Sequence, residues 1–113
     1  MHTQDAASGL ALMGWVFTGL LLLVAVICFA AARGVIALNS VVGLRVPALT
    51  RSEDAWRSGH AAGQAPALVA FAVALVFSTL GLASPLAYWG TLAVFLGGLT
   101  WIVIRATNAA NAA

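Results

Sequence analysis

The chain has 113 residues, of which 63% are hydrophobic and only 7% are charged, with a formal net charge of +2. Soluble domains carry roughly 25% charged residues, so this composition excludes a domain that faces water and indicates one domain surrounded by lipid. Anionic headgroups account for the small positive charge, which gives no indication of nucleic acid binding, and the single Cys28 excludes an internal disulfide.

Three long apolar runs without charge, residues 10–32, 65–83 and 86–104, predict three transmembrane helices. The first run has about 23 residues and extends about 34 Å as a helix, which suffices for one crossing. We do not expect this run to be a cleaved signal peptide. The tail before it has no Lys or Arg, and the run exceeds the roughly 7–15 apolar residues of a signal core.

The second and third runs are separated by a short break, so the two helices are expected to form an antiparallel hairpin. Gly81 is placed to end one helix, Ser84 to cap the next, and Pro85 to take its first position. Small residues spaced by four predict close helix packing in lipid, although alanine is abundant enough here for any single pair to be coincidental. These small residues are Ala70, Ala74 and Ser78 on the second run, and Ala93 and Gly97 on the third.

The connection between the first two runs, residues 33–64, carries most of the charged side chains. Four of the five basic residues lie there, Arg33, Arg45, Arg51 and Arg57, and Arg105 closes the third run. The positive-inside bias therefore predicts that this connection and the C-terminus are cytoplasmic and that the N-terminus is outside. Aromatic residues are expected to mark the two interfaces: Trp15, Tyr88 and Trp89 outside, Trp56 and Trp101 inside.

The fold predicted is an all-α membrane protein with three transmembrane helices and a cytoplasmic interfacial helix between the first and the second. We expect one membrane domain, residues 1–113, with these parts: an external tail 1–9, a span 10–32, a cytoplasmic loop and interfacial helix 33–64, spans 65–83 and 86–104, and a frayed tail 105–113. Pro66 is expected to bend the chain where the interfacial helix turns into the second span.

Within the connection, Asn39, Gly43 and Pro47 predict an irregular loop. A helix is expected to follow, with Ser52 favoured over Thr50 as its cap because Glu53 and Asp54 then lie at the positive helix end. Trp56, His60 and Gly63 fall on one face of this helix.

These residues also resemble a known signature. The pattern Asn39-x-x-x-Gly43-Leu44-Arg45-x-Pro47, then Ser52-Glu53-Asp54-x-Trp56-Arg57 and His60, resembles the SdpI family of bacterial membrane proteins over roughly residues 30–105. Val46 and Leu49 stand where that family commonly has threonine, and its longer members carry an additional N-terminal half. The resemblance implies a role in immunity to a secreted peptide toxin, or in signalling by holding a regulator at the membrane.

Three side chains in this segment have alternative interpretations. Arg45 can reach a headgroup, pair with Glu53 or Asp54, or bind a partner's carboxylate. His60 is expected to be a hydrogen-bonded interfacial residue, since no second ligand lies at a spacing suited to a metal. Trp56 is expected to anchor the interface, with a ligand-stacking platform as the alternative.

No motif for catalysis, a cofactor or a metal is present, so we expect a protein that is not an enzyme. The candidates for partner binding or for a structural knot are Asn39, Gly43, Arg45, Glu53, Trp56 and His60. Two functions compete: an immunity or signalling protein of the bacterial cytoplasmic membrane, and an accessory subunit of a larger membrane complex. The expected partners are membrane lipid and another membrane protein or a peptide, with no nucleic acid.

Overall fold

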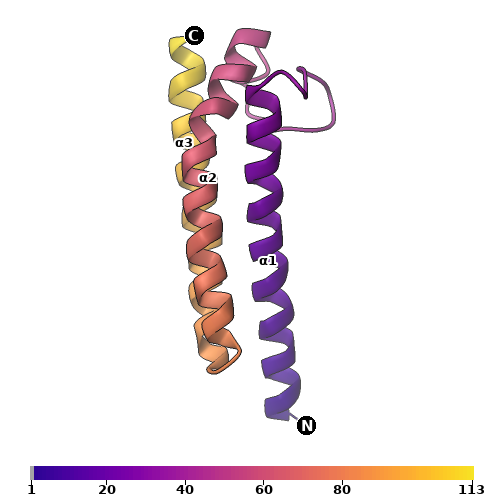
Figure 1. Cartoon of the computed structure of the whole chain (residues 1–113), viewed down its shortest axis with the longest axis vertical. Helices are drawn as coiled ribbons and strands as arrows, with labels where there is room; N and C mark the ends of the chain where they lie inside the picture. The colour runs from indigo at the N-terminus through magenta and orange to yellow at the C-terminus, as the bar shows by residue number, and fades with distance from the viewer. Residues whose placement is uncertain (1) are drawn as a thin grey trace.

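A computed structural model describes residues 2–113, and all regular structure in this range is helical. Helix α1 (His2–Ala32) is followed by a loop, residues 33–52, and then by α2 (Glu53–Gly81). A short 3-10 turn, η1 (Pro85–Ala87), leads into α3 (Tyr88–Ala112). The three helices form an antiparallel bundle, with the loop and the C-terminus at one end and the N-terminus and η1 at the other (Figure 1). These are called the loop end and the turn end below.

All three helices are long and apolar enough to cross a membrane, as predicted. Large hydrophobic side chains cover the outside of the bundle, for example Leu12, Leu68 and Ile104, each more than half exposed. A helix that is apolar on every side is stable only where its outer face also avoids water. The chain therefore has the architecture of a multi-pass membrane protein.

The helices approach through small residues, and α2 lies between its two partners. Ala70, Ala74 and Ser78 are all buried, which confirms the predicted ridge on α2. The ridge predicted on α3 is wrong: Ala93 and Gly97 are exposed. Gly98 takes the contact instead, since a Cβ added there would lie 2.7 Å from the Ala70 Cβ. Successive residues of a helix are about 100° apart around its axis. The contact face of α3 is therefore rotated by about 100° from the predicted one.

The hairpin between α2 and α3 forms as predicted, although its residues play different parts. Gly81 lies inside the last turn of α2, and a Cβ there would come within 2.5 Å of the Tyr88 ring. Ser84 occupies the capping position without a side-chain hydrogen bond, and Pro85 begins η1. Tyr88 is only 2% exposed, so its ring packs inside the bundle. Its hydroxyl accepts a hydrogen bond from Trp15 Nε1 at 3.2 Å.

A chain of three buried hydroxyl groups, one from each helix, joins the bundle near the turn end. The Thr18 hydroxyl donates to the Gly14 carbonyl at 2.8 Å, so it must accept the proton of Ser78, which lies 2.9 Å away. The Ser78 hydroxyl in turn accepts from Thr91 at 2.9 Å. Each of the three hydroxyl groups thereby donates its proton to an acceptor, as buried polar groups in an apolar surrounding require.

The helix ends differ from the expectation. Residues 105–113 were expected to fray, but α3 continues to Ala112, and both Ala106 and Ala110 are buried. The structure does not show a separate interfacial helix, because Glu53 to Gly81 form one continuous helix through the buried Pro66. Figure 1 shows that the first turns of α2 lean away from the axis of the remainder. Proline cannot donate to the carbonyl four residues earlier, which accounts for this bend.

Candidate functional site

The loop begins with a tight reversal of the chain at the end of α1. Gly34 has φ +82°, a left-handed conformation that side chains with a Cβ rarely adopt. The Val35 N–H donates to the Ala30 carbonyl at 2.9 Å, and the Gly34 N–H donates to the Ala31 carbonyl at 3.2 Å. These two bonds satisfy two of the last carbonyl groups of α1 and direct the chain back over the loop end.

Asn39 organises the middle of the loop with its side-chain amide. Its Oδ1 accepts from the Val41 and Val42 N–H groups at 2.8 and 2.7 Å. Its Nδ2 donates to the Ala37 carbonyl at 2.7 Å and to the Val42 carbonyl at 3.1 Å. One side chain thus replaces the hydrogen bonds that a helix or strand would give to this irregular backbone.

Trp56 is the centre of the site and is fully buried, so the prediction that it anchors the membrane interface is wrong. Its indole Nε1 donates to the Ile36 carbonyl at 2.9 Å. Gly43, at φ +123°, lies flat against the indole, and a Cβ at this position would be 2.5 Å from Trp56 Cζ2. The loop therefore closes over the indole through a residue without a side chain.

His60 lies one turn after Trp56 on the same face of α2, as predicted, and it is fully buried. Its Nδ1 donates to the Trp56 carbonyl at 2.7 Å, since a carbonyl can only accept, and its Nε2 accepts from the Leu44 N–H at 3.0 Å. The two rings are 4.3 Å apart. Both ring nitrogens are thus engaged with backbone, and the geometry fits the neutral imidazole that carries its proton on Nδ1.

Arg45 lies on the outer side of this arrangement and is exposed. Its guanidinium is above the Trp56 ring, with Cζ 5.8 Å from the ring centroid, and its Nη1 donates to the Asn39 carbonyl. The alternative in which Arg45 pairs with Glu53 or Asp54 is therefore wrong. The Glu53 carboxylate is occupied elsewhere, because it accepts from the Leu38 N–H at 3.0 and 3.2 Å.

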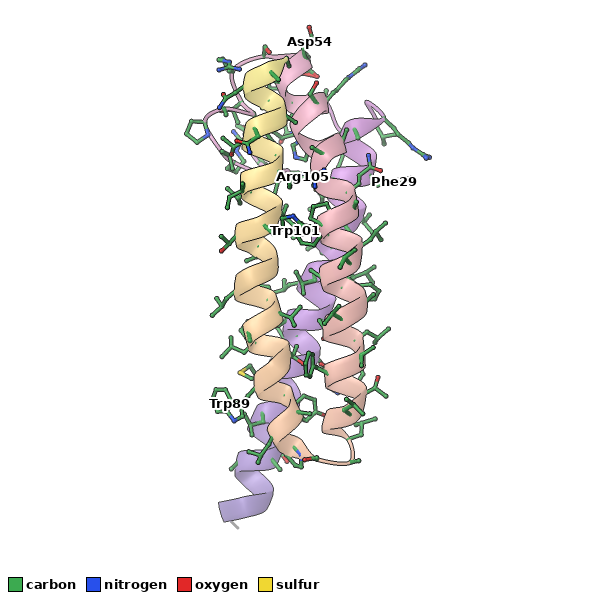
Figure 2. All side chains as sticks on the ribbon, turned by 90° about the vertical axis from the view of Figure 1, so that its left-hand side faces the viewer. Phe29, Asp54, Trp89, Trp101 and Arg105 are labelled. Carbon is green, nitrogen blue, oxygen red and sulfur yellow. The ribbon has the colours of Figure 1, made fainter. Side chains whose placement is uncertain are left out.

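Five of the six candidate residues contact one another directly, and Glu53 joins them only through the N–H of Leu38, the residue before Asn39. We call the six residues the loop knot: Asn39, Gly43, Arg45, Glu53, Trp56 and His60. Ser52 caps α2 as predicted, since its hydroxyl accepts from the Ala55 N–H at 3.1 Å. Asp54 lies at the extreme loop end in Figure 2.

Two residues that support the loop knot were not expected from the sequence. Leu49 is fully buried in an apolar cluster with Ala55, Ala106 and Ala110, which explains an aliphatic residue at this position. Arg51 donates from Nη2 to the Ala110 carbonyl at 2.9 Å, and this bond ties the loop to the end of α3. Leu49 lies in an irregular loop without a periodic pattern, so only the tertiary contact shows that it is buried.

The chemistry that the loop knot offers is recognition of anions. Every buried side-chain nitrogen and oxygen atom in the described part of the chain has a hydrogen-bond partner. Guanidinium groups at the surface retain free N–H donors, whose planar arrangement suits carboxylates and phosphates. In comparisons with known proteins, no family model, curated protein or solved structure matches this chain.

Proposed function

We propose that this chain is a non-enzymatic integral membrane protein of the SdpI type, which acts by binding a peptide or protein partner at the membrane. The observation that carries the proposal is the loop knot. The residues of the signature are not scattered over the loop, because Gly43, Trp56 and His60 pack together and hold Arg45 at the surface. A set of framework residues around one exposed cation is the arrangement that a binding site needs.

The six residues divide by exposure into a framework and a contact residue. Trp56 and His60 are fully buried and cannot touch a partner. Arg45 is exposed, and both the Trp56 ring and the Asn39 carbonyl restrict its orientation. An oriented guanidinium loses less conformational freedom on binding. We propose that Arg45 binds a carboxylate of the partner, either an acidic side chain or a chain terminus.

The proposal places the protein in a bacterial cytoplasmic membrane, with the N-terminus outside and the loop knot on the cytoplasmic side. The bias of arginine toward the loop end supports this orientation. In this placement the first turns of α2 lie at the cytoplasmic interface, before the chain enters the bilayer near Pro66. Trp89 and Arg105 lie toward opposite ends of α3 in Figure 2, which fits one aromatic and one cationic boundary.

The test compares three single variants in a bacterial strain that lacks the endogenous protein and is challenged with a membrane-active peptide. Arg45→Ala is expected to abolish protection, and Arg45→Lys to reduce it, because lysine keeps the charge without the planar fork. Arg105→Gln removes the same charge from α3 and is expected to retain protection. Equal protection by all three variants, at equal protein levels, would contradict the proposal.

A second candidate, an accessory subunit of a larger membrane complex, is favoured by the exposed face of α3. Ala93 and Gly97 leave this face open, and an added Cβ at Gly97 would meet no atom within 4 Å. Another transmembrane helix could approach closely there. Purification in mild detergent followed by mass spectrometry separates the two candidates. The subunit is favoured if a multi-subunit enzyme is recovered in stoichiometric amounts with the wild-type chain but not with Gly97→Leu. In that case, deletion of this protein should also leave the sensitivity of the cells to the peptide unchanged.

A further inference from the structure

An apolar groove runs between α1 and α2 near the loop end. Its volume is about 380 Å³, and it is open along the side of the bundle that faces lipid. Its apolar lining comes mainly from α1, with Leu22, Val26 and Phe29 among the residues, and α2 contributes Leu68. The groove ends at the loop, where its wall is formed by Val35 and by one cation, Arg33. An apolar groove with a charged end is complementary to an amphiphile, which has an apolar chain and a charged head.

A second guanidinium, that of Arg57, does not line the groove but lies beside its charged end, next to the residue between Arg33 and Val35. Arg33 lies over the Phe29 ring, with Cζ 3.7 Å from the centroid. Arg57 reaches from α2 to the neighbouring Gly34, where an added Cβ would be 2.7 Å from Nη2. Both arginines are exposed. Among residues 6–113, whose side chains the structure describes, neither guanidinium has a hydrogen-bond acceptor, in contrast to Arg45 and Arg51, which both donate to backbone carbonyls.

We propose that this groove is a binding site for one anionic glycerophospholipid, with an acyl chain along α1 and the phosphate bound by Arg33 and Arg57. Acyl chains of any lipid can fill the groove, so the two guanidinium groups provide the selectivity. Guanidinium binds phosphate through two parallel hydrogen bonds. A zwitterionic headgroup brings a cationic amine to the same place, where two arginines repel it. The inference requires only that the helices lie in a membrane and is independent of the function proposed above.

The test is native mass spectrometry of the purified protein with phosphatidylglycerol or phosphatidylcholine of identical acyl chains. The wild type is expected to retain one phosphatidylglycerol in preference to phosphatidylcholine. Each basic residue near an anionic lipid contributes roughly fivefold, so Arg33→Gln with Arg57→Gln is expected to lower this preference by about 25-fold. Arg105→Gln is the matched control, because it removes an exposed arginine from α3, which does not line the groove.

A second variant tests the groove itself. Val26 is 55% exposed and lines the groove, so Val26→Trp fills it from the lipid side without entering the core. Loss of the bound phosphatidylglycerol in this variant, with unchanged thermal unfolding, is expected. Equal retention of both lipids by the wild type would overturn the proposal. The proposal is also overturned if Arg105→Gln lowers the preference for phosphatidylglycerol as much as the double variant does. Unchanged retention of phosphatidylglycerol by Val26→Trp would overturn it as well.

Discussion

The contact between Gly43 and Trp56 allows a quantitative test of how the loop is held. An alanine at position 43 must either adopt φ +123° or displace the loop. Side chains forced into sparsely populated backbone regions cost about 1–3 kcal/mol. The new Cβ would also lie 2.5 Å from Trp56 Cζ2, and overpacking of this kind costs about 1–3 kcal/mol. The indole cannot retreat easily, because its Nε1 is bonded to Ile36. We expect Gly43→Ala to destabilise the fold by about 2–6 kcal/mol.

Equilibrium unfolding in mixed detergent micelles, followed by circular dichroism, measures this difference. The control is Gly97→Ala, since Gly97 lies in α3 with open space at its Cβ position. It is expected to be neutral or up to about 1 kcal/mol more stable, because alanine is the better helix former. Adding Trp56→Phe to Gly43→Ala removes the two ring atoms nearest to the new Cβ. Relative to Trp56→Phe alone, Gly43→Ala should then cost only the free energy of the backbone strain and no longer that of the overlap. If Gly43→Ala and Gly97→Ala are equally stable, the reasoning about the loop knot is wrong.

Three further predictions concern the bundle, its orientation and the loop. Ser78→Ala interrupts the hydroxyl chain and should lower the free energy of unfolding by about 0.5–2 kcal/mol, whereas the lipid-facing Thr79→Ala, whose hydroxyl bonds only within its own helix, should change it little. Orientation can be read by impermeant thiol labelling of intact cells in a Cys28→Ala background, with single cysteines at three exposed serines: Ser8, Ser40 and Ser84. Labelling is expected at the first and third positions, and labelling of the loop cysteine from outside would reverse the orientation. Arg51→Gln loses the bond to the Ala110 carbonyl and should speed amide hydrogen exchange in the last turns of α3, and unchanged exchange would show that the bond is dispensable.

Much of this fold follows from the sequence because lipid leaves few alternatives. Uncharged runs of sufficient length must be helices, and the short break around Pro85 allows only a hairpin. The cap at Ser52 is also a local property, since the hydroxyl and the amide it accepts from are three residues apart. The gathering of Trp56 and His60 on one face follows from helical spacing alone.

The rotation of α3 could not be predicted, because nearly every position of that helix is apolar and no amphipathic stripe distinguishes Gly97 from Gly98. Packing against Ala70 decides between them. Tryptophan at the end of a membrane span usually lies at the interface. The sequence placed Gly43 and Trp56 among the candidates for one structural knot, but it does not show that the indole is buried beneath the loop. The hydrogen-bond acceptor of Arg45 could not be predicted either, because a carboxylate nearby in sequence is a stronger expectation than the Asn39 carbonyl.

The bond between Arg51 and the Ala110 carbonyl has a consequence for the order in which the protein is made. The two residues are 59 positions apart, and all of α2 and most of α3 lie between them. During synthesis the loop therefore emerges long before its partner on α3 exists. At roughly 5–20 residues per second, the loop would wait for several seconds with Leu49 unburied. A nascent chain at that stage offers an apolar surface to the insertion machinery or to a chaperone, and it loses this surface once α3 is in place.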